Sequence, residues 1–394
     1  MEGMRVLDLT SIVFGPWATQ MMGDMGADVI KVEAPEGDVF RYGGPRRNPG
    51  MGGLFLSSNR NKRSIVLDLK SPDGLKALQR LIEDADVFVH SMRPQAVERL
   101  GLSYDEVAAI NPKIVYCGGY GYRRDGPYGE RPAFDDMIQA LSGIAMLQKR
   151  LLGEPAYVPS VLADKTMSMA LFGNVAMALL HRERTGEGQE VETTMFETMT
   201  AFTMVEHLFG HAFEPPLAST GYSRVLTANR KPYRTKDGYI GVLPYTDGQW
   251  RSFFEATGRA DLAEDPRFAT VAARLENIDY VYGEIANLMT ERNSAEWLEI
   301  FEAVHVPANE VNDLDDLLVD PHLEAIGFWQ EADHPSEGRV RMSSPPARFS
   351  KSPGTIRRLA PRLGEHTSEV LAEAGFAEAE IAALIKSSAA RQGD

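Results

Sequence analysis

Short apolar runs alternate with amphipathic stretches through the first 120 residues of the chain. The apolar runs predict buried strands at residues 5–9, 28–33, 64–69, 87–89 and 114–116. Helical patterns lie between them, at residues 17–25, 72–84, 95–100 and 104–110. Because strands that alternate with helices form parallel sheets, this pattern predicts an α/β, doubly wound, Rossmann-like domain. Such sheets bind their ligands at the carboxyl ends of the strands.

The pattern changes at Pro215-Pro216, where a polar run indicates a linker. A hairpin that turns at residues 235–238 and several later helices then predict a smaller α+β domain. Two further strands and a helix pair follow, at 328–332, 338–342 and 364–386, and we expect the tail beyond Ser387 to fray. A chain of 394 residues exceeds the usual size of one core, so we predict two domains.

The most apolar helix is predicted from about Lys165 to Arg184, and we expect it to be buried. Asp164 stands directly before it. One interpretation makes Asp164 a helix N-cap, which accepts hydrogen bonds from free backbone amides. The other makes it a nucleophile that attacks an activated acyl group and forms a covalent intermediate. Composition alone does not separate these two interpretations.

The charge and cysteine content limit the possible partners. The chain has 41 Lys and Arg against 56 Asp and Glu, a net charge of −15, which argues against nucleic acid or an anionic membrane as a partner. A single cysteine, Cys117, excludes an internal disulfide framework and suits a reducing compartment. No leader pattern opens the sequence and no run of 18 apolar residues offers a membrane span. We therefore expect a soluble cytoplasmic protein.

Motifs for common cofactors are incomplete in this sequence. Gly119-Tyr-Gly121 begins like a dinucleotide fingerprint, but Arg124 stands at the next glycine position and a Pro/Gly loop follows instead of a helix. The sequence contains no phosphate-binding lysine motif and no Cys or His spacing for a metal, so we expect no bound metal. Cys117 and His90 end predicted strands and are expected to be structural.

Basic residues gather in the first hundred positions, mostly in loops or just after predicted strands. They are Arg41, Arg46, Arg47, Arg60, Lys62, Arg63, Lys70, Arg93 and Arg99. In an acidic protein, cations at the binding edge of a parallel sheet suit a phosphorylated ligand. Solvated surface charge remains the alternative for any single one of them.

Several separated stretches, in the same order, match one known family. They include Arg5-Val-Leu-Asp-Leu9, Gly26-Ala-Asp-Val-Ile-Lys-Val-Glu33, Asn61-Lys-Arg-Ser-Ile-Val-Leu-Asp-Leu-Lys70, Glu98-Arg-Leu-Gly101, Gln139-Ala-Leu-Ser-Gly143 and Arg184-Thr-Gly-Glu-Gly-Gln189. The chain thereby resembles the class III coenzyme A transferases, which include formyl-CoA transferase and share a fold with α-methylacyl-CoA racemase. The resemblance covers nearly the whole chain and is densest in the first 195 residues.

The resemblance implies roles for individual residues. Asp164 would be the catalytic aspartate, which forms first an aspartyl-acyl anhydride and then an aspartyl-CoA thioester. CoA would be a substrate, with no tightly bound cofactor needed. The residues implied to meet CoA are Arg41, Leu67, Lys70, Met92 and Arg99, and those implied for the acyl pocket are Val13, Phe14, Phe134 and Asp135.

The resemblance also implies an architecture. Residues 1–215 would form most of a large CoA-binding domain, residues 216–325 a small inserted domain, and residues 326–394 a segment that returns to the large domain. Two chains would form a homodimer of interlocked rings. Nothing in the composition indicates this interlocking, which is implied by the family alone.

Two departures from the family pattern bear on the substrate. Formyl-CoA transferases carry glutamine where this chain has Val13 and a glycine run where it has Gly241-Val-Leu-Pro-Tyr245, which argues against oxalate and formate. An apolar pocket with a cation from the loops around Arg46, Arg47, Arg123 and Arg124 would favour a C4–C5 dicarboxylic acid as acceptor. Racemases carry a His-Asp pair at Phe134-Asp135, and phenylalanine cannot exchange a proton. An acyl-CoA racemase or isomerase and a non-catalytic acyl-CoA binder remain the alternatives to a transferase.

Overall fold

The computed structural model describes residues 1–393, which divide into two compact units. The sheet unit combines Met1–Ser142, Pro159–Ala201 and the segment from His322 onward. The insert unit combines Gly143–Val158 and Phe202–Pro321. The chain thus passes between the units four times, and the assignment of residues 1–215, 216–325 and 326–394 to domains stays a prediction.

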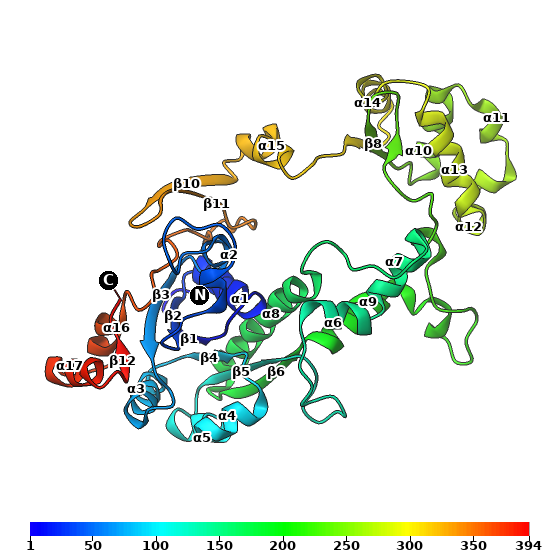
Figure 1. The fold of residues 1–394 in the computed structure, drawn as a ribbon. Coiled ribbons are helices and arrows are strands. Elements are labelled where there is room, and N and C mark those ends of the chain that lie inside the picture. The colour runs from blue at the N-terminus through cyan, green and yellow to red at the C-terminus, as the bar shows by residue number, and fades with distance from the viewer. Residues whose placement is uncertain (394) are drawn as a thin grey trace. The chain divides into compact units, whose positions relative to one another are not determined.

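Seven strands form the central sheet of the sheet unit, in the order β12-β3-β2-β1-β4-β5-β6 (Figure 1). Their bounds are β1 (Arg5–Leu9), β2 (Asp28–Glu33), β3 (Lys62–Leu67), β4 (Val87–His90), β5 (Val115–Tyr120), β6 (Gln189–Thr194) and β12 (Ala390–Arg391). The first six run parallel to one another. This order and direction confirm the prediction of a doubly wound, predominantly parallel α/β sheet.

The tail of the chain differs from its prediction. Residues beyond Ser387 were expected to fray, but β12 pairs antiparallel with β3, with Ala390 opposite Leu67. The main-chain amide of Asp68 also donates to the carbonyl of Ala389 (2.9 Å). The expectation was wrong because a strand of two residues leaves no periodic pattern in a sequence.

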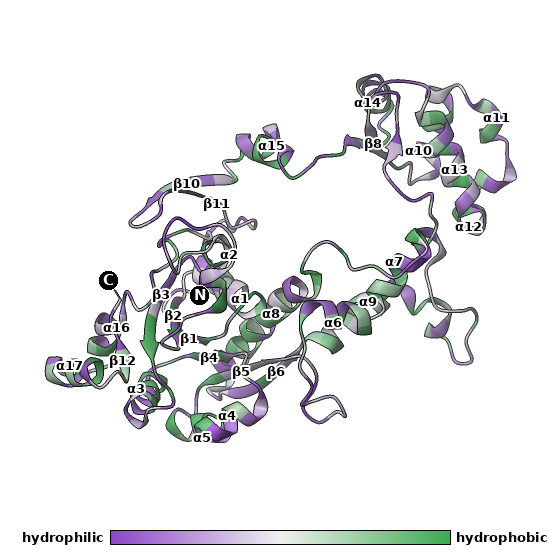
Figure 2. Ribbon diagram, in the orientation of Figure 1, coloured by the Kyte–Doolittle hydropathy of each residue, from purple (hydrophilic) through white to green (hydrophobic). Residues whose placement is uncertain are grey.

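Helices cover both faces of this sheet. A hydrophobic cluster on one face joins alternate strand residues such as Leu7, Ile30 and Phe88 to the helices α3 (Pro72–Glu83), α4 (Pro94–Leu100), α5 (Tyr104–Ile110), α16 (Thr367–Glu373) and α17 (Glu378–Lys386). The other face is covered by α1 (Phe14–Asp24) and α8 (Leu162–Thr185), which pack against each other. Green, hydrophobic residues are clear along β3 and in parts of α8 in Figure 2. Because strand side chains alternate, the polar side chain of Asp8 faces α1 and accepts a hydrogen bond from Thr19.

Helix α8 is less buried than its composition predicts. Ala163, Met167, Leu171, Val175 and Ala178 are buried, but Met169, Met177 and Leu180 on another side are exposed. The prediction of full burial is therefore wrong for the described single chain, since an apolar composition does not say which neighbours are present.

Smaller elements complete the two units. In the sheet unit, β10 (Trp329–His334) and β11 (Gly338–Ser343) form the predicted antiparallel hairpin, and α2 (Gly53–Ser58), α6 (Asp135–Leu141) and α15 (Pro321–Ala325) are short.

The insert unit has a three-stranded antiparallel sheet of β7 (Tyr233–Arg234), β8 (Tyr239–Val242) and β9 (Ala308–Glu310). Its larger helices are α7 (Ile144–Leu152), α10 (Asp247–Thr257), α13 (Ile278–Met289) and α14 (Ser294–Ala303). An aromatic cluster that includes Trp250, Phe253 and Phe301 forms its core. Helix α9 (Met195–His207) runs from the first unit into the second.

Candidate active site

The strand order places the candidate site at the carboxyl edge of the sheet. Strands β2 and β3 lie on one side of β1, whereas β4 and β5 lie on the other, and ligands of doubly wound sheets bind where the order reverses in this way. Two cavities lie at this edge, and Ser11, after β1, and Met92, after β4, line both of them. The two cavities therefore adjoin at the reversal point.

The larger cavity has a volume of about 680 Å³ and is lined by residues that follow β1, β2, β3 and β4. Four of the five residues predicted to meet CoA lie on its wall, namely Leu67, Lys70, Met92 and Arg99. Lys70 and Arg99 are exposed, and neither side chain forms an ion pair within residues 1–393. Two unpaired cations beside one cavity suit an anionic ligand. The structure brings these four residues together, and their contact with CoA stays a prediction.

Arg41, the fifth predicted residue, lines neither cavity. Its guanidinium is fully buried and forms a two-pronged ion pair with Glu33, through Nε (2.7 Å) and Nη2 (2.6 Å). Its Nη1 atom donates to the carbonyl oxygens of Gly50 (3.2 Å) and Pro361 (3.1 Å), and the group lies 3.8 Å over the ring of Phe55. In this structure Arg41 supports the surrounding loops, and its predicted contact with CoA stays a prediction.

Asp164 lies on the wall of the smaller cavity, whose volume is about 180 Å³. It belongs to the first turn of α8 and is 9% exposed. Burial, together with the carboxylates of Asp135 and Asp136, raises the pKa of the Asp164 carboxyl to about 7. A carboxyl with a strongly raised pKa on the wall of a cavity is typical of a functional group.

The free amides at the start of α8 are capped by Asp135 and not by Asp164. The Oδ1 atom of Asp135 accepts hydrogen bonds from the backbone amides of Ala163 (2.7 Å) and Asp164 (3.1 Å). Its Oδ2 atom accepts a third from Gln139 Nε2 (2.6 Å). The interpretation of Asp164 as a helix cap is therefore wrong, because a carboxylate from α6 already occupies that position.

The predicted acyl pocket is only partly assembled around the smaller cavity. Phe14 and Phe134 line it, and Phe134 is 57% exposed. Asp135 is buried behind the wall, and Val13 is half-buried and does not line the cavity. The assignment of these four residues to an acyl pocket stays a prediction.

Gly119 and Gly121, at and just after the end of β5, let the cavity wall pack closely. A Cβ atom on Gly119 would lie 2.6 Å from the ring of Phe14, and one on Gly121 would lie 2.2 Å from the Cβ atom of Ala133. The glycine pair that begins like a dinucleotide fingerprint is thus required here by the close approach of side chains.

The structure places different cations at the smaller cavity from those expected. Arg46 and Arg47 line a separate cavity with the β10-β11 hairpin. Arg123 is paired with Asp125 (2.6 Å) and Arg124 with Glu192 (3.1 Å), and neither lines the smaller cavity. Arg93 and Arg131 line it instead. Arg93 stands three residues after His90, the last residue of β4, and this position was a signal in the sequence, because the carboxyl end of β4 borders the reversal point.

His90 and Cys117 have the structural roles that the sequence predicts. His90 Nδ1 accepts a hydrogen bond from the Met92 amide (3.2 Å), and Nε2 lies 3.4 Å from Tyr120 Oη. Burial lowers the pKa of His90 to about 3, so the ring is neutral, and burial raises the pKa of the Cys117 thiol to about 12. His90 therefore fixes the backbone at Met92, on the wall of both cavities.

Within residues 1–393, no three His, Cys, Asp or Glu side chains are grouped to hold a metal ion. Among the same residues, no helix is both long enough and apolar enough to cross a membrane.

Comparison with known proteins gives consistent matches along the whole chain. The model of CoA-transferase family III matches residues 1–367. A succinate--glutarate CoA-transferase of Agrobacterium fabrum is 32% identical over 95% of this chain and 95% of its own length. A succinyl-CoA:mesaconate CoA-transferase of Haloarcula hispanica is also 32% identical, over 95% of this chain and 96% of its own. The crystal structure of a CAIB/BAIF family protein from Brucella suis is 31% identical, with a TM-score of 0.79 over 95% of this chain and 98% of that one.

Proposed function

The protein belongs to CoA-transferase family III and is an enzyme that transfers CoA, and we propose that the transfer proceeds through covalent intermediates on Asp164. The observation that carries this proposal is the position of Asp164. Its carboxyl is buried, lies on a cavity wall and has a pKa raised to about 7. A poorly solvated carboxylate is a stronger nucleophile than one in water, because little hydration has to be removed before attack.

The proposed reaction exchanges activated acyl groups of similar energy. A carboxylate oxygen of Asp164 attacks the thioester carbon of the donor, the carbon–sulfur bond breaks, and an anhydride and CoA thiolate form. The thiolate attacks the Asp164 carbonyl of the anhydride and expels the donor acid, which leaves an aspartyl-CoA thioester. The acceptor carboxylate then attacks this thioester, and the released thiolate takes the new acyl group and frees Asp164. No step changes an oxidation state.

We further propose that CoA lies in the larger cavity. Lys70 and Arg99 would face its phosphates, and the thioester end would reach the smaller cavity past Ser11 and Met92, which line both. Unpaired cations in one cavity and a nucleophile in the adjoining one suit a ligand that is charged at one end and reactive at the other.

The proposed acceptor is a C4–C5 dicarboxylic acid. Relatives are named as transferases for glutarate, mesaconate and malate. In this chain, Phe14 and Phe134 provide an apolar wall beside Asp164, and Arg93 and Arg131 are cations on the same wall. The Arg93 guanidinium forms no ion pair within residues 1–393 and is free to pair with the second carboxylate of such an acid.

We also propose that the enzyme works as a homodimer in the cytoplasm. The exposed side of α8 carries Met169 (59% exposed), Met177 (65%) and Leu180 (41%). An apolar helix side of this kind is suited to a protein partner, and the resemblance to the family implies that the partner is a second copy.

Substitution and trapping at Asp164 test the mechanism. Asp164→Ala should abolish transfer with every donor while the protein remains folded, because its carboxylate holds no cap. Incubation of the wild-type enzyme with an acyl-CoA and hydroxylamine should form a hydroxamate at Asp164, measured by peptide mass spectrometry. Asp136→Asn removes an exposed neighbouring carboxylate and should still be labelled at Asp164. Turnover by Asp164→Ala near the wild-type rate, or a label on another residue, would show that the nucleophile lies elsewhere.

A further inference from the structure

Four buried charges form two ion pairs beneath the loop that follows β1. Lys62 Nζ lies 2.9 Å from Asp8 Oδ2, and Lys31 Nζ lies 3.0 Å from Asp38 Oδ2. All four side chains are at most 4% exposed. Burial of ions is costly unless each is paired, so this balanced set is retained at a considerable energetic cost. Such an arrangement calls for a reason beyond stability.

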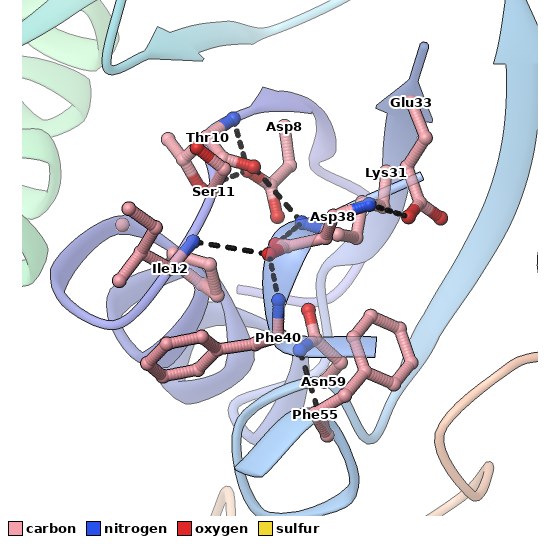
Figure 3. Close-up of polar contacts among 12 residues, drawn as sticks. Asp8, Thr10, Ser11, Ile12, Lys31, Glu33, Asp38, Phe40, Phe55 and Asn59 are labelled. Carbon is pink, nitrogen blue, oxygen red and sulfur yellow. Dashed lines mark hydrogen bonds and ion pairs between the residues drawn. The ribbon is translucent and has the colours of Figure 1, made fainter. Parts of the chain in front are cut away.

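The loop above these charges holds a strained residue. Ile12 has a φ of 73°, in the left-handed region that a β-branched side chain rarely adopts. Its amide donates to Asp38 Oδ1 (3.2 Å), which also accepts from the Phe40 amide (2.9 Å), as Figure 3 shows. Lys31, the partner of Asp38, donates to the carbonyl oxygen of Thr10 (2.9 Å). One ion pair therefore holds the loop on both sides of Ser11.

This loop forms part of the wall of both cavities. Thr10 and Ser11 line the larger cavity, whereas Ser11, Ile12 and Phe14 line the smaller one beside Asp164. A strained backbone persists only where its surroundings fix it, and such strain is concentrated at functional sites. The position of the Asp164 cavity wall thus depends on the contacts that hold Ile12.

We propose that Asp38 is a positioning residue of the transfer reaction, which holds Ile12 in its left-handed conformation and so fixes the part of the smaller cavity's wall formed by Ser11, Ile12 and Phe14. Both of its carboxylate oxygens are needed for this role. Oδ1 accepts from the two amides, whereas Oδ2 faces the Lys31 ammonium. An amide in its place has only one oxygen, so it must lose one of these contacts.

The loop that carries Asp38 has supports of its own. The amide of Asp38 donates to Glu33 Oε2 (3.0 Å), the amide of Gly37 donates to the carbonyl of Ala34 (2.8 Å), and the Arg41 amide donates to the carbonyl of Asp38 (2.9 Å). These bonds do not involve the Asp38 side chain. Asp38 itself lines the larger cavity, and its side chain reaches the smaller one through its hydrogen bond from the Ile12 amide.

This inference rests on the proposed function, and four variants test it. Asp38→Asn should lower kcat by about 10- to 100-fold, the size of effect that follows a misplacement of about 1 Å at a reacting centre. Because Asp38 and Ser11 also line the larger cavity, KM for acyl-CoA can change as well, and the fall in kcat at saturating acyl-CoA is the measure of the effect on the smaller cavity. Asp24→Asn is the control, because Asp24 is also buried and ion-paired, with Arg60 (2.7 Å), but lines neither cavity. It should leave kcat unchanged.

Glycine at position 12 provides a specific rescue. Because glycine adopts positive φ without a steric penalty, Ile12→Gly combined with Asp38→Asn should recover most of the kcat of Ile12→Gly alone. A purely structural role for Asp38 predicts no such recovery.

Amide hydrogen exchange separates this inference from the proposed function. Exchange in the peptide over residues 9–14 should become at least about tenfold faster in Asp38→Asn and stay unchanged in Asp24→Asn. Unchanged exchange, an equal loss of kcat in both Asn variants, or no rescue by glycine would each overturn the role of Asp38. A wild-type enzyme that transfers CoA to no acid would overturn the proposed function, while the exchange result would still decide whether Asp38 holds Ile12.

Discussion

The Oδ1 atom of Asp135 lies 3.1 Å from the backbone nitrogen of Asp164 and accepts its amide hydrogen. The Asp135 carboxylate thus caps the free backbone amides at the start of α8, and the Asp164 carboxylate does not. Because two negative charges cannot approach without cost, the same contact helps to raise the pKa of Asp164. Four predictions follow from this site and its surroundings.

The pH dependence of transfer should report the ionisation of Asp164. Only the carboxylate can attack a thioester, so kcat/KM should rise with pH and reach half of its maximum near pH 7. Asp136→Asn removes a neighbouring charge that raises the pKa, so the midpoint should move to lower pH. Asp125→Asn changes a distant exposed carboxylate that pairs with Arg123 and should leave the midpoint in place. A midpoint that stays put or rises in Asp136→Asn would contradict this assignment.

The free energy of unfolding should show the opposite dependence on pH, because ionisation of Asp164 destabilises the fold. The folded pKa of Asp164, about 7, lies above its ordinary value of 3.8, so the carboxyl stabilises the fold relative to the carboxylate. This contribution is complete below about pH 4 and is lost as the pH rises through 7. Asp164→Asn stays neutral, and its free energy of unfolding at pH 8 should exceed that of the wild type by up to about 4 kcal/mol. Denaturant unfolding at pH 4 and pH 8 measures the difference, which should shrink at the lower pH.

Arg93 should determine the preference for dicarboxylic acids. Arg93→Gln should lower kcat/KM for succinate or mesaconate by about 10- to 100-fold, because a hydrogen bond to a charged group contributes about 1.5–3 kcal/mol. The value for butyrate, which has no second carboxylate, should change little. Arg123→Gln removes an exposed arginine outside the cavity and serves as the control. Equal losses for both kinds of acid would assign Arg93 to CoA instead.

Arg41 should contribute to the stability of the fold, whereas Lys70 should contribute to the binding of acyl-CoA. Arg41→Ala leaves Glu33 buried without its partner, so the free energy of unfolding should fall by about 3–5 kcal/mol. Lys70→Ala removes an exposed side chain on the larger cavity, so the melting temperature should stay constant while KM for acyl-CoA rises. A stable Arg41→Ala enzyme with a raised KM would show that Arg41 meets CoA after all.

The sheet could be predicted because each of its main strands is a local pattern. Residues 5–9 and 28–33 were predicted with the bounds that β1 and β2 have, since a buried strand is mostly apolar along its own length. The amphipathic pair α16 and α17 was found for the same reason. A strand of two residues such as β12 has no such pattern, and its partner lies in a distant part of the chain.

The sequence identifies several residues that line the two cavities, such as Asp164 and Lys70, but it does not give the contacts between site residues. The sequence placed Asp164 at a helix start, but a cap supplied by Asp135 depends on how α6 packs against α8. The left-handed Ile12 is likewise invisible, because the hydrogen bond that fixes it comes from Asp38, a residue in another loop. Such contacts depend on the tertiary structure and produce no pattern of residue spacing in the sequence.

Phe134 lines the smaller cavity and yet is largely exposed. It forms part of the wall beside Asp164, yet 57% of its surface is exposed and the hydrophobic cluster of the sheet does not include it. Exchanges at such a position change the shape of the cavity at little cost to folding. Gly119 and Gly121, by contrast, admit no side chain without displacing their neighbours. If Phe134 contacts the acid as proposed, we expect new acid specificities to evolve at this position while the sheet, the glycines and Asp164 stay as they are.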